Sequence, residues 1–223
     1  MTVKKQTVTK TPRKTGARER AAKTTRDTIL RAAIKVFSKY GLSGGSLDKI
    51  SRAAKSHDRM IYYYFGNKDG LFVAALEEIY RRFNEAEAAL ELDLNDPVAS
   101  MRMIIRFILH YYRDHPEFIA ILNSENLLRG QHISQSNTAK EFSIAAIGVI
   151  EKTLQIGTQK GLFRSNLRSR DIYLMIASLG YFYQSNRFTL TAFLGENLES
   201  PTIFSEWEDF VTHSVLRTLL IAN

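Results

Sequence analysis

Side chains able to bind nucleic acid gather between residues 46 and 68. Arg59 can bind a guanine edge through two hydrogen bonds, and His57 can donate to a base or a phosphate. Asp58 suits a helix N-terminus and can also accept a hydrogen bond from cytosine. The full set of expected contact residues, including hydroxyl and ammonium groups suited to phosphates, is Ser46, His57, Asp58, Arg59, Tyr62, Tyr63, Tyr64 and Lys68. Simple capping or solvation is the alternative role for His57, Asp58 and Arg59.

Two short helices are expected to present these side chains. Ser46 can cap the first helix, which carries Ile50 and Ala54, and the second helix carries Ile61. The spacing of these three apolar residues predicts a small contact between the helices, and Ala53 together with Ala54 would let them approach closely. A helix-turn-helix arrangement of this kind places its second helix in the major groove of duplex DNA.

Longer helices are expected on both sides of this pair. Thr24 and Asp27 have the spacing of a capping box, so a helix is predicted to begin there and to end before Gly41, which suits a left-handed position. Gly66 closes the second short helix. Asn67 is expected to cap a long helix that runs to about residue 92.

The run TRDTILRAAIKVFSKYGLSGGSLDKISRAAKSHDRMIYYYFGNKDGLF, from residue 25 to 72, resembles the DNA-binding domain of the tetracycline-repressor (TetR) family of transcriptional regulators. The resemblance rests on "ILRAA…F…YG" in the first helix, on the serine at 46, and on the "YYYF…NK…LF" closure. It implies a two-domain, all-helical homodimer with a divergent ligand-binding body, in which a small molecule usually relieves repression.

Three residues in the turn depart from the family's pattern. Lys55 and Ser56 stand where the family usually has a glycine and a small apolar residue, and His57 stands where it usually has a serine. A residue other than glycine can adopt a left-handed turn at a cost of about 1 kcal/mol, so the fold remains accessible. Because these departures adjoin the expected reading helix, no operator sequence is carried over from the family.

The net charge of +8 is concentrated near the N-terminus. Residues 1–25 hold eight Lys or Arg and one Glu, residues 26–72 hold nine basic and four acidic residues, and residues 73–223 hold fourteen and eighteen. This division favours a polyanion-binding module attached to a body with another role. We expect a flexible basic arm at 1–23 that contacts phosphates or a minor groove, and a DNA-binding domain at 24–72. A tail that only keeps the chain soluble is the alternative for the arm.

Helical periodicity continues through residues 73–223, the expected ligand-binding and dimerisation domain. Pro97 lies near the first turn of one helix, and His115 with Pro116 breaks it. Further helices are expected at about 118–128, 138–160, 169–194 and 201–222. The prediction is an all-α fold with about nine helices, because no useful stretch alternates as a half-buried strand would.

The last two helices are expected to form the dimer interface. The stretch 172–183 is apolar on nearly all sides, as suits a helix buried by its own domain on one side and by a partner on the other. The expected interface residues are Tyr183, Phe204, Trp207, Val211 and Val215. Ordinary core helices are the alternative.

A small-molecule cavity is expected between the long fourth helix and the middle helices. Apolar walls with sparse polar groups are typical of such sites. The expected lining residues are Phe83, Phe107, Tyr111, Asn123, Asn126, Ser178 and Phe182. Each of them taken singly is more often a packing residue than a ligand contact.

The sequence lacks the residues that several kinds of functional site require. The absence of cysteine excludes disulfides, thiolate metal sites and catalytic thiols. His110 and His115 are five apart and share no helix face, so neither a metal nor a cofactor is expected. No phosphate loop, nucleophile elbow or dinucleotide fingerprint is present, so an enzyme has no positive support. No apolar run spans a bilayer, so a cytoplasmic protein without a membrane partner is expected.

The expected partners are therefore a double-stranded DNA operator, a second copy of the chain and an unknown small-molecule effector. The expected function is a ligand-responsive transcriptional regulator that a small molecule releases from its operator. A DNA-binding activator, or a nucleoid-associated factor without a ligand response, is the alternative, since no residue specifies repression.

Overall fold

A computed structural model describes residues 15–221, with side chains from residue 19 onward. This part of the chain is helical throughout, with no strand and one isolated bridge between Phe163 and Leu220. None of the helices in this range has the length and apolar character needed to cross a membrane. The elements are α1 (Thr15–Gly44), α2 (Leu47–Ala54), α3 (Asp58–Phe65), α4 (Lys68–Ala88), α5 (Pro97–Asp114), α6 (Pro116–Leu127), the 3-10 helix η1 (Ile133–Gln135), α7 (Ala139–Gln159), α8 (Ser169–Leu194) and α9 (Pro201–Leu219).

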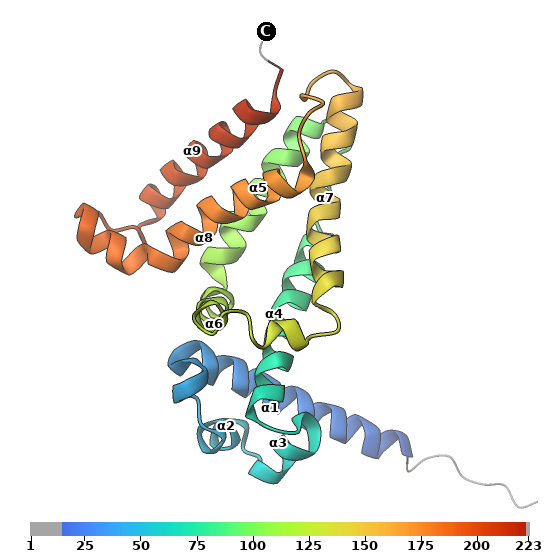
Figure 1. Cartoon of the computed structure of the whole chain (residues 1–223), viewed down its shortest axis with the longest axis vertical. Helices are drawn as coiled ribbons and strands as arrows, with labels where there is room; N and C mark the ends of the chain where they lie inside the picture. The colour runs from blue at the N-terminus through green and yellow to red at the C-terminus, as the bar shows by residue number, and fades with distance from the viewer. Residues whose placement is uncertain (1–14, 222–223) are drawn as a thin grey trace, which may run out of the picture.

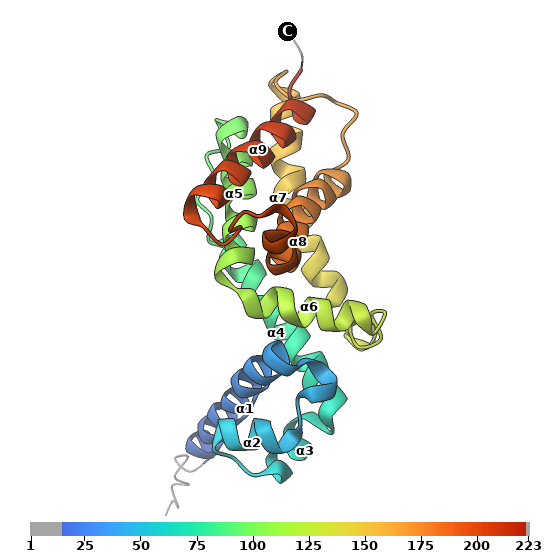
Figure 2. The same cartoon turned by 90° about the vertical axis from the view of Figure 1, so that its left-hand side faces the viewer.

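The first three helices form one end of an elongated molecule (Figure 1). Helix α4 begins in that end and runs into the body, where α5, α7, α8 and α9 pack. Helix α6 lies across the junction and packs closely on α1, as the turned view shows (Figure 2). No separate linker joins the two parts, because α4 belongs to both.

Helix α1 begins earlier than the capping signal predicts. The helix already runs from Thr15, and the hydroxyl of Thr24 donates to the carbonyl of Arg20 at 2.9 Å, inside the helix. The prediction of a cap at Thr24 is therefore wrong, because the residues before it are mostly good helix formers such as alanine and arginine. Residues 15–23 of the expected flexible arm are helical, and residues 1–14 lie outside the described part.

Two other predicted helix caps near the turn are confirmed. Ser46 accepts a hydrogen bond from the backbone N–H of Lys49, and Asn67 accepts one from Gly70 at 2.7 Å. Lys55, which stands at a turn position where a glycine is usual, adopts the left-handed conformation with φ of 51°. Gly41 also has a positive φ, of 65°, and kinks α1 where its end was expected.

A small core holds the three-helix end together. Ile50, Ala54 and Ile61 are buried as predicted, whereas Ala53 is exposed and does not mediate the approach of α2 and α3. Phe37 of α1 packs edge-on against Phe72 of α4, with ring centroids 5.1 Å apart. This contact ties the three-helix end to the helix that continues into the body.

Two predicted ends in the body differ from the structure. Helix α4 ends at Ala88 rather than near residue 92, because Leu90 and Leu92 leave the helical path and pack against the core. Helix α9 ends at Leu219, where Leu220 becomes extended and Phe163 pairs with it. The start and end of α8 agree with the prediction.

Candidate DNA-binding face and effector cavity

Helix α3 turns one face inward and presents the other to solvent. Ile61 is fully buried against the three-helix core, which fixes the helix about its axis. The opposite face is open: 54% of Tyr62 and 77% of Tyr63 are exposed. His57, Asp58 and Arg59 at the helix start are exposed as well. The structure therefore brings these five expected reading residues together on one surface.

The expected phosphate-binding residues flank this surface. The oxygen of Ser46 caps α2, which leaves its hydroxyl hydrogen available to a phosphate. Tyr64 is half-buried and packs edge-on against Tyr63. Lys68, in the first turn of α4, lies within 3.4 Å of the carbonyl of Ser43, so its ammonium sits beside the α1–α2 connection. Hydroxyl and ammonium groups around an exposed helix are the arrangement that positions a reading helix on a duplex.

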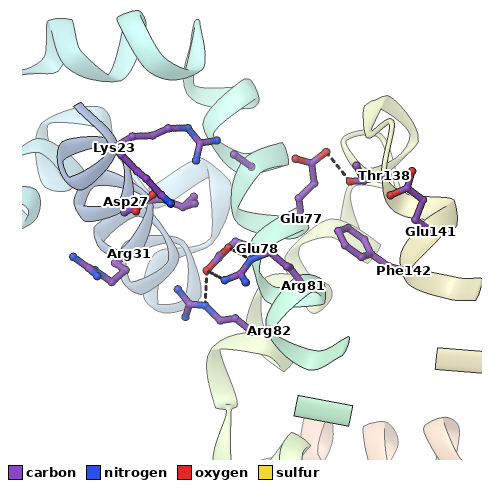
Figure 3. A pocket seen from close by; sticks show the side chains of 13 residues that line it. Lys23, Asp27, Arg31, Glu77, Glu78, Arg81, Arg82, Thr138, Glu141 and Phe142 are labelled. Atoms are coloured by element: carbon purple, nitrogen blue, oxygen red, sulfur yellow. Dashed lines mark hydrogen bonds and ion pairs between the residues drawn. The ribbon is translucent and has the colours of Figure 1, made fainter. Parts of the chain in front are cut away.

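A charged cleft of about 710 Å³ lies where α1 meets α4 and the start of α7 (Figure 3). Lys23 and Arg31 project from α1, and Glu78 projects from α4. Glu78 accepts hydrogen bonds from Arg81 and Arg82, and the bond from Arg81 is the main cause that lowers the pKa of this carboxyl group. Walls that carry both charges make this cleft unsuited to an apolar ligand.

A second, aromatic cavity of about 160 Å³ lies deeper in the body, between α4, α5, α6, η1, α7 and α8. It is walled mainly by rings and small apolar side chains, and its lining residues are Tyr80, Phe83, Asn84, Tyr112, Phe118, Ile133, Ala139, Phe142, Ser143, Ala146 and Tyr173. Apolar walls with a few polar groups are the usual makeup of a small-molecule site.

Two buried acceptors on α4 have no hydrogen-bond partner, and one of them belongs to Asn84, which lines this cavity. The amide nitrogen of Asn84 donates to the carbonyl of Phe142 at 3.1 Å, but its Oδ1 has no partner in the described structure. Glu87, one turn further along α4, is 3% exposed and its Oε1 is likewise unpaired. Burial raises the pKa of Glu87 to about 7. Burial is also the main cause that raises the pKa values of Tyr112 and Tyr173, and the charge of Glu87 raises them further.

The structure does not assemble the seven expected ligand residues into one site. Phe83 lines the aromatic cavity. Phe107 and Tyr111 do not line it but pack against the ring of Phe83, with ring centroids 5.5 and 4.9 Å from that of Phe83. Asn123 and Asn126 both contact the hydroxyl of Tyr181.

Two members of that set lie elsewhere. Ser178 is exposed and bonds to the carbonyl of Met175, and Phe182 is 58% exposed and lines a groove between α8 and α9. Both residues lie on the outward face of α8, and the sequence alone did not reveal which face of this helix points outward.

A chain of contacts joins the aromatic cavity to the three-helix end. Glu125 of α6 accepts hydrogen bonds from the backbone N–H groups of His132 and Ile133 at 2.7 and 2.8 Å, and lies 2.9 Å from His132 Nδ1. Ile133 lines the cavity, while the ring of His132 packs edge-on against Phe72 with centroids 5.1 Å apart. Phe72 in turn packs on Phe37 of α1. Neighbouring residues of one segment thus contact the aromatic cavity and the aromatic core shared by α1 and α4.

A second link runs directly from α6 to α1. The backbone N–H of Leu42 donates to the hydroxyl of Ser124 at 3.3 Å. Together with the close packing of α1 on α6, this bond fixes the three-helix end against the body (Figure 2).

Most of the five expected interface residues are buried within the chain itself. Phe204, Val211 and Val215 of α9 are buried inside the protomer. Tyr183 is buried too, donates to the carbonyl of Leu198 at 2.9 Å and stacks on the half-buried Trp207. Phe204, Val211 and Val215 therefore mark the face that α9 turns to its own body, whereas Tyr183 and Trp207 line the groove between α8 and α9. A partner contact through these residues stays a prediction.

The exposed apolar side chains of α8 and α9 occupy the other faces of these helices. Phe193 is 84% exposed, and Phe182 and Phe210 are each 58% exposed. Phe182 and Phe210 border an apolar groove of about 450 Å³ between the two helices. Such a contiguous exposed apolar surface is typical of a protein interface.

Sequence reasoning missed the polar residues on the buried side of α4. Tyr80, Asn84 and Glu87 recur at helical intervals beside the buried Phe83, so two polar groups interrupt the apolar stripe of α4. That interruption was a usable signal. The contribution of Phe142 from α7 had none, because it depends on how α7 packs against α4. In the described part of the chain, no three His, Asp or Glu side chains are grouped as a metal site requires.

Comparison with known proteins gives a consistent likeness at both ends. Residues 29–75 match the family described as bacterial regulatory proteins, tetR family, and residues 97–215 match the tetracyclin repressor-like C-terminal domain. The chain is 50% identical over 207 residues to the HTH-type transcriptional repressor NicS of Pseudomonas putida, covering 93% of this chain and 98% of the relative.

More distant likenesses extend over most of the chain. It is 23% identical to the repressor SCO4008 of Streptomyces coelicolor, over 70% of this chain and 76% of that protein. A crystal structure of a TetR transcription regulator from Haloarcula marismortui is similar in fold, with a TM-score of 0.70 at 14% identity, over 89% of this chain and all of that one.

Proposed function

The chain belongs to the TetR family of transcriptional regulators, and we propose from this premise that it is a repressor released from its DNA operator by a small molecule. The observation that carries the proposal is the likeness over nearly the whole chain to a protein named as a transcriptional repressor. The exposed face of α3 supports the proposal independently, because a helix that is held at the surface and presents Arg59 and two exposed tyrosines can enter a major groove.

Each group on the DNA-binding face has a separate proposed role. Arg59 reads a base edge, and His57, Asp58, Tyr62 and Tyr63 complete the reading surface of α3. The hydroxyls of Ser46 and Tyr64 and the ammonium of Lys68 bind phosphates and so set the register of the helix on the duplex; within the expected bounds, residues 24–72 form the DNA-binding domain and residues 73–223 the effector-binding and dimerisation domain.

The repressor is proposed to act as a homodimer through the outward faces of α8 and α9. Phe182, Phe193 and Phe210 supply an apolar patch that a second copy would cover. A two-fold dimer places two reading helices about 34 Å apart, so that they meet successive major grooves on one side of the duplex.

The effector site is proposed to be the aromatic cavity. A ligand there would contact Ile133 and shift the segment held by Glu125, and His132 would pass that shift to Phe72. The reading helices of the dimer would then lose their matched spacing, which weakens operator binding by a shift of population. Binding to chromosomal DNA places this activity in the cytoplasm, and binding rather than catalysis is the proposed role of the body.

The test measures binding to labelled fragments of the protein's own upstream DNA by fluorescence anisotropy. The wild type is expected to bind one fragment far more tightly than random DNA. Arg59→Ala should reduce that preference by about 1–3 kcal/mol, since a bidentate contact to a base contributes about that much. Arg102→Ala, at an exposed site on α5, is the matched control and should bind as the wild type does.

Two outcomes would contradict the proposal. Equal binding to every fragment would indicate a nucleoid-associated factor, and equal losses for Arg59→Ala and Arg102→Ala would remove α3 from the interface. A reporter gene whose expression falls when the protein is deleted would identify an activator instead.

A further inference from the structure

We propose that the aromatic cavity binds an uncharged single-ring ligand through an acceptor oxygen, such as a ketone carbonyl, and that the hydroxyls of Tyr80, Tyr112 and Tyr173 hold this oxygen. The proposal rests on the proposed function, because it takes this cavity as the effector site. It goes further by stating which polar groups a ligand can reach there and what these groups require of the ligand.

The size of the cavity limits the ligand to about one ring. Its volume of about 160 Å³ is close to the roughly 150 Å³ of an apolar cavity that takes up benzene. A ligand with two fused rings or a long chain would require the walls to move. Phe83, Phe118 and Phe142 supply rings for stacked or edge-to-face contacts with a flat ligand.

Three phenols line the cavity with hydroxyls that have no partner. Tyr80 comes from α4, Tyr112 from α5 and Tyr173 from α8, and none of their hydroxyls has a hydrogen-bond partner among the described residues. The described polar atoms that are both unpaired and sealed belong to other side chains, among them Asn84 and Glu87. The three phenol oxygens are therefore unpaired but still reachable.

The same hydroxyls are withdrawn from bulk water. Burial raises the pKa of Tyr80 to about 12, and burial is also the main cause that raises the pKa values of Tyr112 and Tyr173. The charges of ionised Tyr173 and Tyr80 raise the pKa of Tyr112 further, which places the three oxygens near one another. Because these oxygens are buried, reachable and carried by the walls of one cavity, they open onto that cavity.

Unpaired hydroxyls favour a ligand that accepts hydrogen bonds. A neutral phenol has one hydrogen to donate, and a carbonyl oxygen has two lone pairs, so one ligand oxygen can accept from two phenols. A ligand that only donates would leave the buried phenol hydrogens unpaired, which is costly. Two other polar side chains of the wall are already engaged: Ser143 donates to the carbonyl of Lys140 at 2.9 Å, and Asn84 donates to that of Phe142 at 3.1 Å.

The surrounding charges disfavour a charged ligand. After burial, the charge of Glu87 also raises the pKa values of Tyr112 and Tyr173, and the charge of Glu125 raises that of Tyr80. Both carboxylates would likewise repel an anion bound at these oxygens, and none of the lining residues is basic. A cation finds no carboxylate among the lining residues, and the unpaired oxygen of Glu87 is sealed. An uncharged acceptor is therefore the group that fits.

The experiment compares four single-ring probes on the full-length protein at pH 8. Acetophenone carries a carbonyl oxygen, and isopropenylbenzene has nearly the same shape with a CH₂ group in its place. Benzylamine carries a charged donor, and benzoate carries an anionic acceptor. Titration calorimetry should show that acetophenone binds about tenfold more tightly than isopropenylbenzene, as one or two neutral hydrogen bonds imply. Benzylamine and benzoate should both bind more weakly than acetophenone.

Phenylalanine variants remove one hydroxyl at a time and keep the ring. Tyr112→Phe and Tyr173→Phe should each reduce the preference for acetophenone over isopropenylbenzene several-fold, and the triple variant that also carries Tyr80→Phe should remove it. Isopropenylbenzene affinity should stay within about twofold of the wild type in all of them. Tyr173→Phe keeps the test decisive if Tyr112→Phe fails to fold.

The carbonyl group of bound acetophenone reports its hydrogen bonds directly. Its infrared stretching band should lie at lower wavenumber in the wild type than in Tyr112→Phe, because donated hydrogen bonds weaken the C=O bond. Tyr181→Phe is the matched control, since the hydroxyl of Tyr181 already bonds to Asn123 and Asn126 and this residue does not line the cavity. The control should keep both the affinities and the carbonyl band of the wild type.

Overturning results are distinct from failure of the proposed function. Equal binding of acetophenone and isopropenylbenzene, tighter binding of benzylamine or benzoate, no binding of acetophenone, or equal effects of Tyr181→Phe and Tyr112→Phe would each refute the proposed ligand class. In those cases, retained binding to the upstream DNA fragment leaves the repressor standing. Absence of specific DNA binding by the wild type would instead refute the repressor.

Discussion

Replacing Glu87 with glutamine is expected to change how the stability of the fold depends on pH. The side chain of Glu87 is buried on α4, and burial raises its pKa from the ordinary value of 4.5 to about 7. Between these values the unfolded chain loses the proton of this residue while the folded chain keeps it. The free energy of unfolding therefore falls as pH rises from 4.5 to 7 and then levels off.

The size of this effect follows from the pKa difference. At about 1.4 kcal/mol per pKa unit, a rise from 4.5 to about 7 corresponds to roughly 3 kcal/mol of stability lost above pH 7. Glutamine has nearly the same shape and does not titrate, so Glu87→Gln should avoid that loss. Any cost of burying its amide is constant with pH. The variant should thus gain on the wild type by up to roughly 3 kcal/mol between pH 5 and pH 8.

Urea unfolding at pH 5, 6, 7 and 8, followed by circular dichroism at one fixed protein concentration, measures this difference. The buried Tyr112 and Tyr173 stay neutral across the range because burial raises their pKa values, so they add no slope. Glu91→Gln, at an exposed position, should run parallel to the wild type. The reasoning is refuted if the stability gap between Glu87→Gln and the wild type is the same at pH 5 and pH 8.

Three other changes probe the DNA face, the dimer and the junction. Lys68→Ala should weaken binding to all DNA sequences alike and lower the slope of log affinity against log salt by about one, measured by anisotropy at several salt concentrations. Phe210→Asp should convert dimers to monomers in analytical ultracentrifugation, while the control Leu127→Asp, at an 85% exposed site on α6, should not. Glu125→Ala leaves buried N–H groups, including that of His132, without an acceptor, so urea unfolding should show a loss of several kcal/mol; a loss under 1 kcal/mol would contradict the assigned burial.

Local signals in the sequence predicted local structure well. Ser46, Asn67 and Gly66 mark helix ends because a cap is an interaction between residues a few positions apart. Thr24 misled for a related reason: a threonine within a helix can donate back to the preceding turn, so the same pattern occurs without a helix start.

Orientation was harder to predict than helix position. Val211 and Val215 share an apolar register on α9, but a register does not state whether the neighbour is the same chain or a second copy. The cavity depends on contacts between distant segments, such as Asn84 with the carbonyl of Phe142, which no spacing along the chain encodes. The candidate reading face of α3 could be predicted from the sequence, because the spacing of Ile50, Ala54 and Ile61 already identified Ile61 as the buried side of the helix.

The shared helix α4 constrains the construction of hybrid regulators. Because α4 starts in the three-helix end and continues into the body, a junction between two parent proteins has to cut a continuous helix. A three-helix end taken from another protein would also need a surface that fits α6, where Leu42 contacts Ser124. It would need an aromatic ring at the position of Phe72 as well, because the ring of His132 packs there. Exchange of α3 surface residues alone leaves all of these contacts intact. If α3 reads the operator as proposed, retargeting the protein to a new operator requires substitutions on one helix face rather than the exchange of a whole domain.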